Sequence, residues 1–312
     1  MNKEELFAFL QPEEKHLRAY VPSPFIVAAL PARDVKNLPF QRNYNGITLT
    51  LSGLKHVPYG RYGRLLLTIL TTHAVLSKNS GEDTVTIEYK NLSNLLKELQ
   101  LPRTRGKDIR EQLEYFSHSA FIFEEKKSIK TKKGYLRELF DEEEYNELKE
   151  NVTAKKYSTG MIPFISELQL LDVSSEGTKK TAAITIKLSS EFSKYSREHS
   201  VPIDYTIYKD ITSPIGKDLY SWLMYRCNSL CDNQEIFIPE KSLVDQFMPV
   251  EEGSARNQEW RNYDYIKGLV EEIKTKYCPE LNVEFITGGM QLKHSKIPNL
   301  KSEYYVLVTS NL

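Results

Sequence analysis

Basic and amide side chains gather around the starts of two predicted helices, one in the first half of the chain and one near its C-terminus. They are Arg103, Arg105, Lys107 and Arg110 in the first group, and Arg256, Asn257 and Arg261 in the second. Cationic side chains bind phosphate, and arginine and asparagine also form paired hydrogen bonds with base edges. Residues at the start of a recognition helix usually reach the bases. The placement therefore indicates two DNA-binding helices.

Each group belongs to a run of predicted elements with the same order. In the first half, apolar spacing predicts helices over 58–77, 91–101 and 107–119, and strands over 84–88 and 120–124. Pro102 ends the second helix, because proline disfavours helical backbone in the residue before it. A basic turn follows the last strand. This order is typical of the winged helix, whose third helix enters the major groove while its β-wing touches the neighbouring backbone.

The C-terminal part repeats this order. Helices are predicted over 218–230, 241–247 and 259–277, a strand over 235–238 and a hairpin over 282–296. One constant shift along the chain places Ile87 on Ile238 and Leu92 on Leu243. A repeated unit determines the fold more strongly than local propensity. The prediction is an α+β fold with two tandem winged-helix domains related by internal duplication.

The predicted boundaries are an N-terminal arm over 1–44, a first winged-helix domain over 45–190 and a second over 200–312. The first domain includes an acidic helical insertion over 135–153.

The outward faces of the two third helices are expected to meet DNA. They carry Lys107, Glu111, Glu114 and His118 on the first, and Arg261, Tyr265, Gly268 and Glu272 on the second. Their carboxylates would repel phosphate unless they accept hydrogen bonds from a cytosine amino group. An ordinary solvated helix face is the alternative interpretation.

The loop after residue 124 is predicted to be a basic wing that contacts phosphates. The whole chain has no net charge, yet residues 53–140 contain 16 Lys or Arg against 10 Asp or Glu. A neutral protein with one basic segment can still bind DNA through one face. The remaining predicted contacts are Lys130, Lys132 and Lys133 in this loop, and Lys293, His294 and Lys296 in the C-terminal hairpin.

Several segments, in order, resemble the plasmid-encoded replication initiators of the RepA type. They are RNYNGITLTLSG, PYGRYGRLLLTILTTHAV, SNLLKELQLPRTRG, IREQLEYFSHS and SPIGKDLYSWLMYR. The resemblance implies a tandem winged-helix initiator that binds repeated sites in double-stranded origin DNA and promotes origin opening. It also implies the host replicative helicase and the host initiator as partners, and homodimers whose role differs from that of monomers.

No catalytic constellation appears in the sequence, so no enzyme, metal or cofactor is expected. The phosphate-binding GxxxxGK[ST] motif is absent, and the six histidines lack metal-binding spacing. Cys227 and Cys231 have no second ligand pair and are interpreted as packing residues. Without a signal peptide or a membrane-length apolar run, the expected location is cytoplasmic, with no membrane partner. A winged-helix transcription regulator or partition protein remains the alternative function.

Overall fold

The computed structural model describes residues 17–44, 47–77, 84–125, 127–130, 153–156, 160–175, 178–231, 233–250, 257–295 and 305–306. These residues form helices and mainly antiparallel sheets, with one parallel pair between β1 (Leu17–Pro22) and β15 (Tyr305–Val306), which confirms the predicted α+β class. None of the helices in this part of the chain is both long and apolar enough to cross a membrane.

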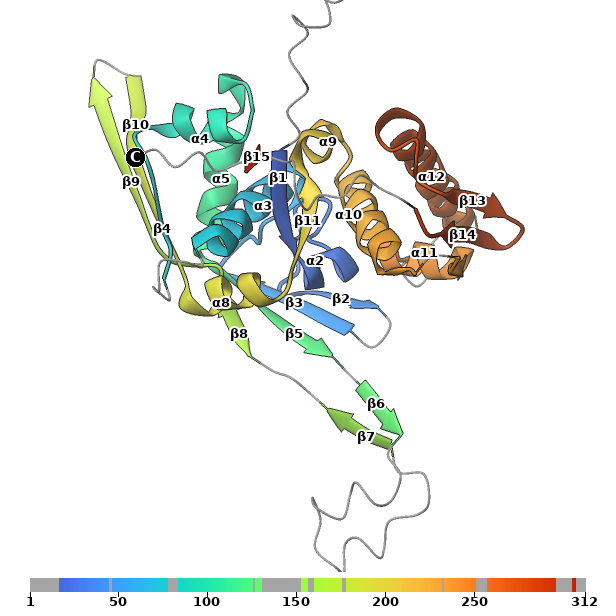
Figure 1. Ribbon diagram of the computed structural model, residues 1–312. Coiled ribbons are helices and arrows are strands. Elements are labelled where there is room, and N and C mark those ends of the chain that lie inside the picture. Colours follow the sequence, from blue (N-terminus) through green and yellow to red (C-terminus); the bar gives the residue numbers. More distant parts are fainter. Residues whose placement is uncertain are drawn as a thin grey trace, which may run out of the picture.

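A long apolar helix, α3 (Gly60–Leu76), forms the centre of the N-terminal half (Figure 1). Every residue from Gly63 to Thr72 is buried, as the wide apolar face predicts. The hydroxyls of Thr68 and Thr72 donate to carbonyls one turn earlier, at 2.9 and 2.7 Å, so these buried oxygens keep hydrogen-bond partners. Strands, α5 and α8 therefore pack around α3 on most of its sides.

The first winged-helix unit is built on α3. Its further elements are β4 (Thr86–Tyr89), α4 (Leu92–Glu98), α5 (Gly106–Ser117), β9 (Ile165–Ser175) and β10 (Thr178–Leu188). The first strand pairs with the last, so the sheet order is β4–β10–β9. The Asn91 side chain accepts a hydrogen bond from the Asn94 amide at 3.0 Å and caps the start of α4.

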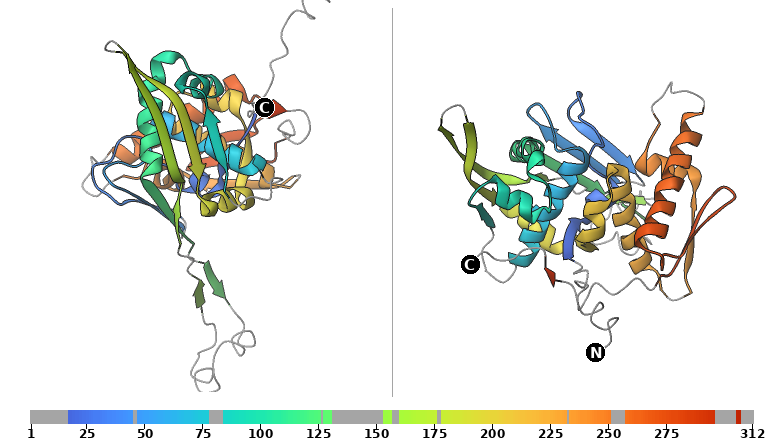
Figure 2. Two further views of the ribbon diagram at one scale, coloured as in Figure 1. Left: turned by 90° about the vertical axis from the view of Figure 1, so that its left-hand side faces the viewer. Right: turned by 90° about the horizontal axis from the view of Figure 1, so that it is seen from above.

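The second unit has the same order and the same pairing. It consists of α10 (Pro214–Ser229), β12 (Glu235–Pro239), α11 (Glu240–Phe247), α12 (Gln258–Glu272), β13 (Val283–Ile286) and β14 (Gly289–Lys293), with a π-helical turn, η3 (Ile273–Tyr277), after α12. Its sheet order is β12–β14–β13. Ile87 and Ile238 each pair with the last strand of their unit. The predicted duplication is confirmed, and the two wings lie at opposite ends of the molecule (Figures 1 and 2).

The predicted first wing is wrong. The strand expected over 120–124 is β5 (Ser119–Glu125), which pairs with β3 (Ile47–Gly53) and β8 (Met161–Pro163) in the sheet β2–β3–β5–β8. Phe121 is fully buried opposite Leu51 of β3, so this strand belongs to the core. The wing is instead the hairpin β9–β10, which follows the insertion.

Residues 17–44 also differ from the predicted arm. They form β1 (Leu17–Pro22), α2 (Ser23–Val27) and β2 (Phe40–Tyr44), and they bury Ala19, Phe25 and Ile26. β1 lies between β11 (Ser200–Asp204) and the short C-terminal strand β15 (Tyr305–Val306). The first unit therefore extends beyond 45–190, because sheet pairing draws both earlier and later segments into it.

A cluster of aromatic rings joins these added elements to the first unit. The ring centre of Phe121 lies 5.1 Å from those of both Phe25 of α2 and Phe164. The ring centre of Phe164 lies 5.5 Å from that of Phe192 of α8 (Ser190–Glu198). Tilted and edge-on aromatic pairs each add about 0.5–1.5 kcal/mol beyond the area they bury. The cluster fixes the four-stranded sheet against the rest of the unit.

The insertion between α5 and β9 contains a short hairpin, β6 (Lys127–Lys130) and β7 (Thr153–Lys156). The expected acidic helical stretch over 135–153 lies almost wholly outside the described residues. The α9 helix (Tyr205–Asp210) leads from β11 toward the second unit.

Candidate nucleic-acid interface

Three of the predicted contact residues lie exposed where α5 begins. Arg103 and Arg105 belong to the 3-10 turn η2 (Arg103–Arg105), and the Lys107 side chain is 86% exposed. Arg105 lies 3.6 Å from Asp108, and Lys107 lies 3.8 Å from Glu111. Surface ion pairs of this kind contribute little stability, so these cations can exchange their carboxylates for DNA phosphate.

Arg110 lies near the start of α5, as predicted, but its side chain is held by two carboxylates of the same chain. Its guanidinium donates to both carboxylate oxygens of Asp172 on β9, at 2.8 and 2.7 Å, and to Glu114 at 3.2 Å. The hydrogen bond to Asp172 raises the pKa of Arg110. The pair joins α5 to the hairpin β9–β10, so Arg110 has an intramolecular role in this structure.

The third helix of the second unit, α12, presents the predicted stripe to solvent. Arg261, Tyr265, Gly268 and Glu272 are all exposed, while Ile266 and Val270 are fully buried on the other side. The amide of buried Asn262 donates to the Met248 carbonyl at 2.8 Å and holds the helix start. The Tyr265 and Ser213 hydroxyls lie 3.2 Å apart. Asn257, just before the helix, is exposed as well.

The remaining predicted DNA-contact residues lie in different parts of the chain, and only some of them are among the described residues. Lys293 lies on β14, with its ammonium 4.0 Å from Glu284. His294 is held against the end of α10, because its ring nitrogen Nδ1 lies 2.9 Å from the Leu230 carbonyl and its amide donates to Gln234. Lys130 belongs to β6, and its side chain is not described. Lys132, Lys133, Arg256 and Lys296 lie outside the described residues.

A buried ion pair, missed in the sequence, links the two units. Arg64 of α3 donates to both carboxylate oxygens of Asp218 on α10, each at 2.7 Å. The two side chains are 3% and 7% exposed. The same guanidinium also donates to the carbonyls of Leu30, Pro31 and Gly60, at 2.6, 3.0 and 2.9 Å. The pair connects the equivalent first helices of both units and fixes one against the other.

Lys217, next to Asp218, is a second buried cation at this junction. Its ammonium donates to the Tyr208 carbonyl and lies 4.3 Å from the centre of the Tyr208 ring. Burial lowers the pKa of Lys217 well below its ordinary value, and nearby Arg61 and Arg64 lower it further. The sequence signal for both contacts is a charged residue inside an otherwise apolar helix.

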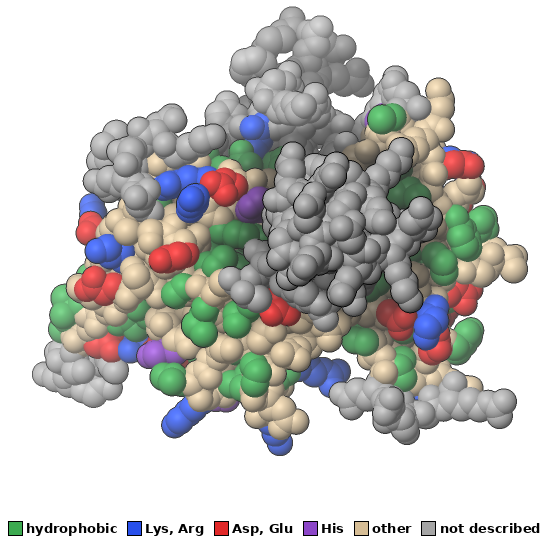
Figure 3. Space-filling view, turned by 90° about the horizontal axis from the view of Figure 1, so that it is seen from below, with side chains coloured by type: hydrophobic (Ala, Val, Ile, Leu, Met, Phe, Trp, Pro, Cys, Tyr) green, Lys and Arg blue, Asp and Glu red, His purple; other side chains and the backbone are tan. Residues whose placement is uncertain are grey.

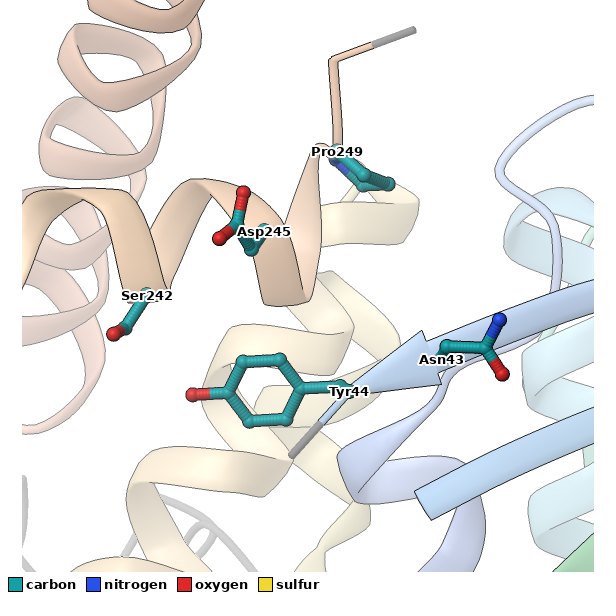
Figure 4. A pocket seen from close by; sticks show the side chains of 5 residues that line it. All are labelled: Asn43, Tyr44, Ser242, Asp245 and Pro249. Carbon is teal, nitrogen blue, oxygen red and sulfur yellow. The ribbon is translucent and has the colours of Figure 1, made fainter. Parts of the chain in front are cut away.

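A polar groove of about 600 Å³ lies between the end of β2 and α11. Asn43 and Tyr44 line it from β2, and Ser242, Asp245 and Pro249 line it from α11 and the residues after it (Figure 4). Burial raises the pKa of Tyr44 above its ordinary value. The groove is another place where the first unit meets the second.

Charge is mixed over the part of the surface that the structure describes. On the face in Figure 3, Lys and Arg side chains are interspersed with Asp and Glu side chains and form no single large patch. Among the described residues, no three His, Cys, Asp or Glu side chains gather in a way that could hold a metal ion. Cys227 is buried, as predicted for a packing residue, and burial raises the pKa of its thiol to about 11. Cys231 is exposed, so the same prediction is wrong for it.

Similarity to known proteins was found among solved structures. No protein-family profile matches the sequence, and no curated protein sequence matches it. Two crystal structures of domains 2 and 3 of RctB, one a selenomethionine derivative, are each 13% identical to this chain. Their matches cover 87% and 88% of this chain and 96% and 98% of the RctB chains, with TM-scores of 0.44 and 0.49. The crystal structure of Pi initiator protein in complex with iteron DNA is 11% identical; the match covers 90% of this chain and 96% of that chain, with a TM-score of 0.43.

Proposed function

We propose that this chain is a sequence-specific, double-stranded DNA-binding replication initiator that binds repeated sites in a plasmid origin. The observation that carries the proposal is the duplicated winged-helix topology, β4–β10–β9 in one unit and β12–β14–β13 in the other. Each unit exposes basic or amide side chains where its third helix begins. The segments that resemble RepA-type initiators supply the replication role.

The buried junction supports one protein binding one composite site. Because Arg64 and Asp218 hold α3 against α10, the two recognition helices have a set separation and orientation. Helix-turn-helix proteins with two such helices contact major-groove segments about 10 base pairs apart or at multiples of that distance. We expect each repeat to contain two contacted segments.

The later steps belong to the same proposal and come from the resemblance. Bound to its repeats, the chain promotes local opening of the origin and recruits the host replicative helicase, together with the host initiator and a second copy of itself. In this proposal the chain binds and positions DNA, while the helicase unwinds the duplex.

The first experiment selects duplexes from a random-sequence library with the full-length chain. Enrichment of one motif is expected, and that motif should recur in the DNA beside the gene. Arg261→Ala should weaken binding about tenfold and relax preference at one base pair, because an arginine on guanine is worth about 1–3 kcal/mol. Uniform weakening over a panel of single-base variants would assign Arg261 to phosphate.

The second experiment separates an initiator from a transcription regulator. The DNA beside the gene is placed on a plasmid that cannot replicate alone, and the protein is supplied from a second plasmid. Maintenance that depends on both the repeats and the protein is expected. Binding to the repeats without any maintenance would favour the regulator.

A further inference from the structure

The outward face of α12 exposes an unusually large apolar side chain. Trp260, in the first turn of the helix, is 66% exposed. The only other tryptophan, Trp222, is 2% exposed and packs edge-on against Phe247, with ring centres 5.5 Å apart. Single exposed apolar residues are common on protein surfaces, so Trp260 alone identifies no ligand.

A glycine on the same face supplies a second, independent observation. Gly268 lies two turns after Trp260, opposite the buried residues of α12, and a Cβ added there would meet nothing within 4 Å. By contrast, a Cβ on Gly216 at the start of α10 would lie 2.9 Å from Ile211. Glycine disfavours helix relative to alanine, and no contact within the described chain requires it at position 268. Glycine at this position would allow another molecule to approach the helix backbone closely.

The charges on the exposed side of α12 indicate what that molecule presents. The exposed cations Arg261 and Lys267 are outnumbered by the exposed carboxylates of Glu259, Asp264, Glu271 and Glu272. A face without excess positive charge is poorly suited to a row of phosphates. It suits base edges in the major groove, where carboxylates accept hydrogen bonds from amino groups and apolar side chains contact the thymine methyl group.

We propose that the face of α12 from Trp260 to Gly268 reads bases. Trp260 packs on the methyl group of a thymine in the major groove, and Gly268 lets the helix backbone lie close against the DNA. The inference rests on the proposed function and adds to it a thymine contact and the two residues that make it. It gives α12 a role unlike that of the α5 start, where Arg103, Arg105 and Lys107 present cations.

The thymine contact is tested with the duplex that the wild-type chain selects. Each thymine is replaced in turn by uracil, which removes only the methyl group. Wild-type affinity should fall about threefold to tenfold at one thymine, whereas Trp260→Ala should bind about tenfold more weakly and ignore that replacement. If no single replacement affects the wild type, or if Trp260→Ala responds to it in the same way, the thymine contact is refuted.

Gly268→Ala separates DNA contact from folding. Alanine should stabilise the helix, yet we expect binding to the selected duplex to weaken about tenfold because the methyl group holds the helix away from the DNA. Gly160→Ala is the matched control, since a Cβ there also meets nothing within 4 Å. Gly268→Ala binding as tightly as wild type would overturn the close approach.

Fluorescence reports the same contact directly. Acrylamide should quench Trp260 in the free chain and lose most of that effect once the duplex is bound, while Trp260→Phe, which retains buried Trp222, should show little quenching in either state. Unchanged quenching with DNA bound would overturn the inference. If binding depends on Arg103 and Arg105 but neither α12 variant alters it, only this inference fails; if the wild type selects no duplex, the proposed function fails with it.

Discussion

Replacing Asp218 by asparagine should destabilise the whole chain. The substitution preserves the shape of the side chain but leaves the Arg64 guanidinium, 3% exposed, without its counter-charge. Breaking a buried pair by neutralising one partner costs about 3–5 kcal/mol, because the remaining charge stays desolvated. We expect the free energy of unfolding to fall by that amount.

Arg64→Met should cost at least as much as Asp218→Asn. It removes the donors that serve three backbone carbonyls, and an unsatisfied buried acceptor costs about 1–3 kcal/mol. The double variant leaves those carbonyls unsatisfied but removes both charges of the Arg64–Asp218 pair. Its destabilisation should therefore lie about 2–3 kcal/mol below the sum of the two single effects.

Urea titration followed by far-UV circular dichroism measures all three variants. Glu284→Gln is the matched control, because it neutralises a carboxylate in an exposed pair with Lys293 at 4.0 Å and should change stability by less than about 0.5 kcal/mol. A cost below about 1 kcal/mol for Asp218→Asn, or strict additivity in the double variant, would refute the reasoning that this pair holds the units together.

Three further outcomes are expected. Asp172→Asn should break the contact between the wing and Arg110, lower the free energy of unfolding by about 1 kcal/mol and weaken binding to the selected duplex. Unchanged affinity would show that DNA binding does not depend on this contact. Burial lowers the pKa of Lys217, so between that lowered value and 10.5 the unfolded chain binds more protons than the folded one and stability rises with pH. The urea midpoint of the wild type should therefore rise relative to that of Lys217→Met as the pH increases toward 10.5. A difference between the two midpoints that does not change with pH would contradict this. Arg103→Ala with Arg105→Ala should weaken binding to all duplexes alike and reduce the salt slope by about 2, measured by titration at several salt concentrations; loss confined to one sequence would assign them to bases.

The helices of both units were predictable because their signals are local. Leucines at helical spacing and Pro102 determine α4, and the shared Ile87 and Ile238 junctions identify the duplication. The first wing was not predictable in this way. A helix followed by the strand 120–124 and a basic loop has the local pattern of a wing, whereas the actual partner of β4 is β10, beyond the insertion.

The candidate site shows the same division between local and distant contacts. Exposure of Arg261 and Tyr265 follows from helical spacing. The partner of Arg110 could not be inferred, because Asp172 approaches it only when the wing folds back onto α5. Arg64 and Asp218 are far apart in the sequence, and each alone looks like an interruption of an apolar helix.

The position of β1 has a consequence for how the chain folds during its synthesis. The Leu17 amide donates to Thr206, 189 positions later, and the neighbouring register pairs β1 with β11. At about 5–20 residues per second, a ribosome needs roughly 10–40 s to make the intervening chain. Until then the buried side chains of β1 and α2 have no completed sheet to cover them. The first unit therefore cannot finish folding before the second begins to be made, and a chaperone has that interval in which to bind the nascent chain.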